Sequence, residues 1–196
     1  MKVELLAVLI LLVGLGILGV WIYIVRQGDA EIEILTAQRT ELQLVSVEDG
    51  KGVFSAQIPL FNLASQDGII LDAFPRHLLP QEQYDAARVE SRLELLTAPR
   101  EDGYFEAVII EGNKGNTLVL TVALTAKNGS LAEAVASMAD MPVELYYQVV
   151  GRGECALHKE RLVLPAAEFK TAFSAQAVVP DAVESETQPA MAEEEA

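Results

Sequence analysis

Two hydrophobic patterns divide the chain. Residues 5–25 form an unbroken apolar run without a charge. A helix of that length rises roughly 30 Å, which matches the hydrocarbon core of a bilayer. From residue 31 onward, apolar and polar positions alternate instead, most regularly over residues 118–125. Strict alternation places one face of a strand on a core and the other in water, so the second part of the chain is predicted to be antiparallel sheet.

The alternating runs predict about eight strands and a further one near the end, separated by turns rich in glycine, asparagine and proline. The expected strands are 31–36, 40–48, 52–61, 68–73, 87–97, 104–111, 117–126, 143–150 and 155–164. The predicted fold class is therefore mainly β: an antiparallel β-sandwich, immunoglobulin-like or similar, of about seven to nine strands. Pro59 interrupts the third run, which indicates an edge position or a bulge because proline cannot donate to a ladder.

One short soluble helix is expected over about 130–140. Ser130 and Glu133 have the spacing of a capping box, and an apolar stripe follows them. Pro142 lies just beyond and is expected to stop the helix. A short stripe of this kind normally packs inward, so the helix should cover one end of the sandwich.

The predicted organisation has five parts. They are a flank at 1–4, a transmembrane helix at 5–25, a hinge at 26–30, the sandwich at 31–171 and a tail at 172–196. The tail contains six acidic residues, no basic residue and two prolines. Such a composition buries too little apolar surface to offset its ordering entropy, so we expect disorder there.

The apolar run is predicted to be an uncleaved membrane anchor rather than a signal peptide. It is longer than a typical signal h-region, and no small-residue cleavage site ends it. Trp21, Tyr23 and Arg26 are expected at the membrane interface, where amphipathic rings and basic groups concentrate. The α-amino group and Lys2 lie before the run, and Arg26 and the more distant Arg39 lie after it. This small bias favours a cytoplasmic N-terminus, with the sandwich outside the cytoplasm.

Gly14, Gly16 and Gly19 lie in the middle of this run and are candidate helix-packing positions, because small residues let a second helix approach closely. Their spacing is not that of a G-x-x-x-G motif. The alternative is that glycine is simply frequent in membrane helices.

Charge and cysteine content exclude several functions. The 196-residue chain has a formal net charge of -15. Nucleic acid requires clustered basic residues, so it is not an expected partner. Cys155 is the single cysteine, which precludes an internal disulfide or a cysteine-based zinc site. We expect Cys155 to be a small buried apolar residue.

No catalytic, cofactor-binding or metal-binding residues are predicted. The two histidines, His77 and His158, belong to no recognisable nucleophile or zinc motif. The most distinctive soluble stretch is the proline-rich segment 74–84. Loops of this kind often carry recognition, which makes Arg76, His77 and Tyr84 the candidate binding residues. The alternative is that the segment's apolar residues plug the core.

Three functional hypotheses follow. The first is a single-pass, non-catalytic binding or assembly module, contacting the bilayer through residues 5–25 and a protein or envelope component through the sandwich. The second is a carrier that holds an apolar or lipid ligand between the sheets, which requires a cavity of several hundred Å³. The third is a membrane-anchored hydrolase, which requires paired carboxylates in a cleft.

Overall fold

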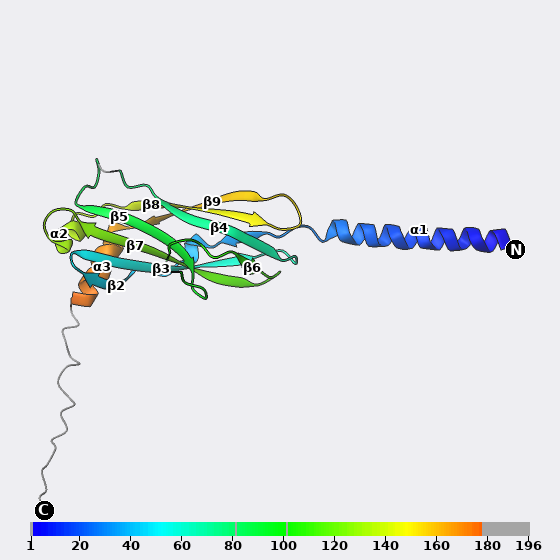
Figure 1. The fold of residues 1–196 in the computed structure, drawn as a ribbon, viewed down its shortest axis with the longest axis horizontal. Helices are drawn as coiled ribbons and strands as arrows, with labels where there is room; N and C mark the ends of the chain where they lie inside the picture. The colour runs from blue at the N-terminus through cyan, green and yellow to red at the C-terminus, as the bar shows by residue number, and fades with distance from the viewer. Residues whose placement is uncertain (1, 81, 101, 178–196) are drawn as a thin grey trace, which may run out of the picture.

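In the computed structural model, a long N-terminal helix leads into a β-sandwich (Figure 1). The structure describes residues 2–80, 82–100 and 102–177. Helix α1 (Lys2–Arg26) projects from one end of the sandwich, and its apolar segment Val3–Arg26 has a mean hydropathy of 2.9 with none of it buried. It is long and apolar enough to cross a membrane, a property that membrane anchors and signal sequences share.

Nine antiparallel strands in the described residues form two sheets, which confirms the predicted fold class. We call them sheet A and sheet B. Sheet A has the order β1-β3-β7-β5, with β2 also paired to β3, and sheet B has the order β6-β4-β8-β9. The strands of sheet A are β1 (Ile32–Ile34), β2 (Gln43–Glu48), β3 (Lys51–Asn62), β5 (Ala87–Leu95) and β7 (Gly115–Ala126). Those of sheet B are β4 (Gly68–His77), β6 (Val108–Ile110), β8 (Met141–Val150) and β9 (Ala156–Leu164).

The core lies between the two sheets and is built by the alternation seen in the sequence. In β7 and β8 every second side chain is buried. The largest fully buried side chains include Phe54, Ile58, Leu118, Leu120 and Met141. Removal of this apolar surface from water is the main favourable contribution to the fold.

Local sequence explains two further features of sheet A. Asp49 and Gly50 both have positive φ (45° and 76°), as the tight turn between β2 and β3 requires. Pro59 lies on β3 between the parts that pair with β1 and with β2. There the chain leaves the sheet edge through the 3₁₀ turn η1 (Thr36–Gln38), so the missing N–H of proline leaves no ladder bond unmade.

Two short helices lie at the end of the sandwich away from α1 (Figure 1). Helix α2 (Leu131–Ala136) is the expected covering helix, and its capping box is present: the Glu133 N–H donates to Ser130 Oγ, and the Ser130 N–H donates to Glu133 Oε2. It ends earlier than residue 140, and Pro142 lies inside β8.

Helix α3 (Ala166–Ala177) was not expected from the sequence. It contains residues 172–177, so a tail starting at 172 is wrong for those six residues; the rest of the predicted tail, 178–196, lies outside the described residues. The buried side chain of Phe169 holds α3 against the core, where its ring meets Phe54 edge-on at a centroid distance of 5.1 Å.

The segment between α1 and the sandwich, expected as a hinge, is tied to the turn between β8 and β9. Both carboxylate oxygens of Asp29 accept backbone hydrogen bonds there, from Arg152 at 2.6 Å and from Gly153 at 2.8 Å. These bonds lower the pKa of Asp29. The Arg152 guanidinium also donates to the Gln27 side chain at 3.2 Å, so the turn contacts the chain directly after α1.

Candidate functional site

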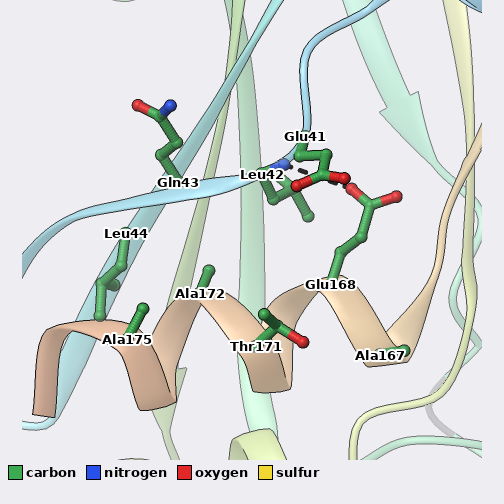
Figure 2. Close-up of a pocket in the computed structure, with 9 residues that line it drawn as sticks. All are labelled: Glu41, Leu42, Gln43, Leu44, Ala167, Glu168, Thr171, Ala172 and Ala175. Atoms are coloured by element: carbon green, nitrogen blue, oxygen red, sulfur yellow. Dashed lines mark hydrogen bonds between the residues drawn. The ribbon is translucent and has the colours of Figure 1, made fainter. Parts of the chain in front are cut away.

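A groove of about 480 Å³ separates β2 from α3 (Figure 2). Its strand side is formed by residues 41–44. Its helix side is formed by Ala167, Glu168, Thr171, Ala172 and Ala175. Strand β2 belongs to sheet A, and α3 directly follows β9, the last strand of sheet B. The groove therefore lies between an edge strand of one sheet and the helix that continues the other.

The groove exists because the α3 side chains along it are short, apart from Glu168 at one end. Ala167, Thr171 and Ala175 are spaced four residues apart and therefore lie along one face of the helix. Phe169 and the half-buried Phe173 lie on the face that packs against the core. The helix is thus held by its aromatic residues while its short side chains leave space beside β2.

An ion pair fixes one end of the groove. The Arg39 guanidinium donates to Glu168 Oε1 at 2.6 Å and to Glu168 Oε2 at 2.8 Å, and the Leu42 N–H donates to Oε2 at 3.2 Å. Arg39 also donates to the carbonyl oxygens of Thr40 and Val163. Hydrogen bonding to Arg39 lowers the pKa of Glu168, which favours the ionised carboxylate at neutral pH.

The edge of β2 that faces away from β3 runs along the groove, and the N–H of Leu42, directly before β2, is already bonded to Glu168. Within the described residues β2 pairs only with β3. The register shifts between Leu44 and Ser46, and such a bulge bends the strand. Val45, which lies in this bulge, and Val47 beyond it are both exposed. An open edge beside a groove is the arrangement in which an extended peptide adds a strand to a sheet.

The three residues predicted as a binding loop do not form one surface. Arg76 and His77 end strand β4, which continues four residues further than expected, and the Arg76 side chain is exposed. Tyr84 is buried, and its hydroxyl donates to the Ala134 carbonyl at 3.0 Å. The structure brings only His77 and Tyr84 together, at a small cavity of about 130 Å³.

His77, which lines that cavity, also has a partner from the opposite sheet. Its Nδ1 lies 3.1 Å from Ser91 Oγ, and burial lowers the pKa of the imidazole. Leu79 lines the same cavity and packs on the core. The packing of Leu79 and Tyr84 matches the plug interpretation of this segment, whereas the exposed Arg76 stands apart from it.

The other predicted positions lie as follows. Trp21, Tyr23 and Arg26 are exposed in the last two turns of α1. A side chain added at Gly14, Gly16 or Gly19 would meet nothing within 4 Å, so these glycines contact no other part of the described chain.

Cysteine and metal chemistry add little to the site. Cys155 is exposed, not buried as expected, because the turn between β8 and β9 extends past the core. Among the residues that the structure describes, no group of three or more His, Cys, Asp or Glu side chains is placed to hold a metal ion.

Sequence reasoning missed the groove because it missed α3. A signal for α3 was present: Pro165 precedes apolar residues at the helical spacing of Ala166, Phe169, Ala172 and Phe173. The position of the opposite face of α3 beside β2 depends on tertiary packing. A local sequence pattern does not contain that information.

Comparison with known proteins gives the chain no family. No protein-family model matches it, and no curated protein matches it. Among solved structures it is similar to a Bordetella pertussis protein given the name ApaA (10% identity, TM-score 0.39, covering 69% of this chain and 94% of that one). It is also similar to the GAE domain of yeast GGA1 (10%, 0.31, 65% and 99%) and to the CooA pilin subunit of enterotoxigenic Escherichia coli (9%, 0.29, 63% and 95%). Likeness at this level carries no information about function.

Proposed function

We propose that this protein is a single-pass, membrane-anchored, non-catalytic binding or assembly module. In this proposal α1 remains in the bilayer and the groove between β2 and α3 receives an extended segment of a partner protein. The observation that carries the proposal is the groove itself, which combines a strand edge left unpaired beyond Leu42 in the described residues with a row of short side chains on α3. Such a site offers main-chain hydrogen bonds along the edge and space for alternate side chains.

The lining indicates the chemistry of the segment. Ala172 and Ala175 give an aliphatic surface, and Thr171 adds a hydroxyl. Glu168 already has its charge satisfied by Arg39. Glu41 is then the lining carboxylate that has no such partner among the described residues. An uncharged, extended segment with small or apolar side chains therefore fits best, because an acidic segment would meet Glu41.

The two other hypotheses receive less support. The groove lies outside the sheets, whereas a lipid carrier requires the space between them, which buried side chains such as Phe54 and Leu120 occupy. A hydrolase that works through paired carboxylates requires a carboxyl group with a raised pKa as its general acid. The pKa of Glu168 is lowered instead.

The membrane anchor and its orientation are part of the proposal. Intact residues 5–25 in the mature protein, seen by mass spectrometry of the membrane fraction, would support an anchor, whereas a mature N-terminus after residue 25 would mean a cleaved signal. We propose a cytoplasmic N-terminus. With a tag at Ala196, cleavage of the domain by protease added to intact cells or spheroplasts supports this orientation, and protection until the membrane is opened contradicts it.

The test of groove binding uses the full chain purified from membranes with its bound proteins. Ala175→Trp places an indole in the groove, and Thr125→Trp, at an exposed position on β7, is the matched control. We expect the amount of a stoichiometric, co-purifying partner to fall at least tenfold in Ala175→Trp and to stay unchanged in Thr125→Trp. In addition, a photoreactive residue at Thr171, but not one at Thr125, should crosslink to that partner.

Two results would overturn the proposal. One is a partner retained equally by both tryptophan variants, which would place binding elsewhere. The other is a purified protein that carries a stoichiometric lipid and no protein, which would favour the carrier.

A further inference from the structure

The first half of strand β9 is exposed to solvent on both faces of sheet B, which distinguishes it from the other long strands in the described residues. Strand β9 is the last strand of sheet B, and within the described residues it pairs only with β8. The side chains of residues 156–159 are exposed on both faces of the sheet, and Leu157 is 64% exposed. This half lies toward the α1 end of the sandwich (Figure 1).

Two hydrogen bonds establish which backbone groups of β9 point away from β8. The Leu78 N–H donates to the Pro142 carbonyl, so the backbone of Pro142 faces β4 and not β9. Its cross-strand partner Val163 therefore also faces away, and the Val163 carbonyl accepts from Arg39 at 3.3 Å. In an antiparallel strand every second residue has the same orientation. The backbone N–H and C=O groups of Leu157, Lys159 and Arg161 consequently point into the open edge.

Arg39 and η1 close the edge only at Val163. Toward the β8–β9 turn, no strand or helix in the described part of the chain covers the three outward residues. An uncovered row of backbone donors and acceptors is a template for pairing with another chain.

The outer face beside this edge is basic, in contrast to the chain as a whole. Arg76, Glu144 and Arg161 lie in one cross-strand row, and Lys159 lies in the next row, where it contacts Glu144 at 3.1 Å. Three basic residues thus surround one carboxylate, giving this cluster a charge of about +2 by simple counting. The complete chain has a net charge of -15. Like charges directly opposite each other on paired strands are destabilising, and opposite charges are stabilising.

The same charges disfavour a second copy of this chain as the occupant. A two-fold pairing that uses all three outward residues must be centred on Lys159, which sets the two lysines directly opposite each other. A pairing centred on Glu160 sets glutamate against glutamate and Lys159 against Arg161. An added strand that carries carboxylates would instead set opposite charges against Lys159 and Arg161.

We propose that the edge of β9 from Leu157 to Arg161 receives an extended acidic segment of a partner protein, which adds a strand to sheet B and sets its carboxylates against Lys159 and Arg161. This site is separate from the groove at β2, which favours an uncharged segment, so either site can exist without the other.

The probe is a fluorescent heptapeptide in which glutamate alternates with valine, with a lysine-for-glutamate version as its counterpart. Binding is measured by fluorescence anisotropy to the full chain in a zwitterionic detergent. Lys159→Pro removes one outward N–H, and since that group does not pair with β8, the sheet keeps its own ladder. Lys159→Ala removes the same charge and keeps the N–H, which makes it the matched control.

We expect the acidic peptide to bind and the basic peptide not to bind. Lys159→Ala should weaken binding a few-fold, and Lys159→Pro at least tenfold. Alternate N-methylation of the peptide should abolish binding to the unaltered protein, a result that does not depend on the proline variant folding. Equal weakening by alanine and proline, or an unaffected N-methylated peptide, would show charge attraction without strand addition and overturn the proposal.

Two further outcomes would assign the edge to another occupant. Tighter peptide binding after deletion of residues 178–196 would mean that the chain's own acidic segment occupies it. A dimer that the peptide dissociates, seen by light scattering, would mean that a second copy does. Both results contradict a partner protein as the occupant.

Discussion

The guanidinium of Arg39 contacts both carboxylate oxygens of Glu168, at 2.6 and 2.8 Å, across 129 residues of sequence. Arg39 precedes β2 and Glu168 lies in the first turn of α3, so this pair connects the two walls of the groove. Both side chains are mostly buried, with exposures of 13% and 23%. Paired geometry of this kind is more specific than a single surface contact.

Separating Arg39 from Glu168 should destabilise the fold and loosen the groove. Because Arg39→Ala leaves a mostly buried carboxylate whose remaining partner among the described residues is the Leu42 N–H, we expect a loss of roughly 1–3 kcal/mol. Denaturant unfolding of Arg39→Ala, Glu168→Ala and the double variant measures the coupling between them. Additive losses would contradict the pairing. Arg88→Ala, in an exposed ion pair with Glu90, is a control that should change little.

Acid should release the same contact. The pKa of Glu168 is lower in the folded protein than its ordinary value, so its contribution to stability is present above the ordinary glutamate pKa of about 4.3. That contribution is lost as the pH falls through the lower folded pKa. Stability measured against pH should therefore fall less steeply over this acid range in Glu168→Gln. Identical slopes in the two proteins would contradict this assignment.

Phe169 should be the residue that attaches α3 to the domain. Its ring is fully buried against Phe54, so Phe169→Ala is expected to cost about 3–5 kcal/mol. Phe173, which is only half-buried on the same helix, is the matched control, and Phe173→Ala should cost less. Thermal unfolding checks the order of the two variants, and an unchanged melting temperature for Phe169→Ala would mean that α3 contributes nothing.

Tyr84 should contribute mainly through its ring and secondarily through its hydroxyl. Tyr84→Phe removes the hydrogen bond to Ala134, whose carbonyl keeps a second donor in the Ser137 hydroxyl. We therefore expect a modest loss of about 1 kcal/mol. Tyr104→Phe, at a 73% exposed position, should have no effect in the same unfolding experiment. A loss as large as that of a core truncation would point to a larger role for this hydroxyl.

Asp29 should restrict the segment between α1 and the sandwich. Asp29→Ala removes the acceptor for the Arg152 and Gly153 backbone N–H groups, and trypsin should then cut after Arg26 faster in detergent-solubilised protein. Glu154→Ala changes a neighbouring exposed carboxylate and should leave the rate unchanged. Equal cleavage rates in all three proteins would mean that the segment moves freely despite these bonds.

Alternation of apolar and polar residues predicted most of the sandwich because strand side chains have a fixed period of two. The run at 117–126 became β7 almost unchanged, and the Ser130 and Glu133 capping box marked the start of α2 correctly. The alternating run and the capping box are both local signals, because each depends on residues a few positions apart in the sequence. The run at 104–111 shrank to the three residues of β6, since most of that stretch does not pair with a neighbouring strand.

The candidate sites were harder to predict because they depend on contacts between distant segments. Arg76 was grouped with Tyr84 by sequence proximity, but the strand places Arg76 on the outer face of sheet B and the following loop turns Tyr84 into the core. The residue opposite Arg76 is Glu144, which in turn lies opposite Arg161, and no spacing in the sequence relates these residues.

The attachment of Asp29 to the β8–β9 turn also determines how far each proposed site lies from the end of α1. With α1 held upright in a bilayer and the sandwich continuing in the same direction (Figure 1), a 12-residue strand such as β3 spans roughly 40 Å above the membrane surface. The free half of β9 lies at the bottom of that span, and the groove between β2 and α3 lies at its top. If α1 is the proposed anchor, a short loop of a neighbouring membrane protein would reach the proposed lower site, whereas the proposed upper site would require a partner with a tall domain or a long extended arm.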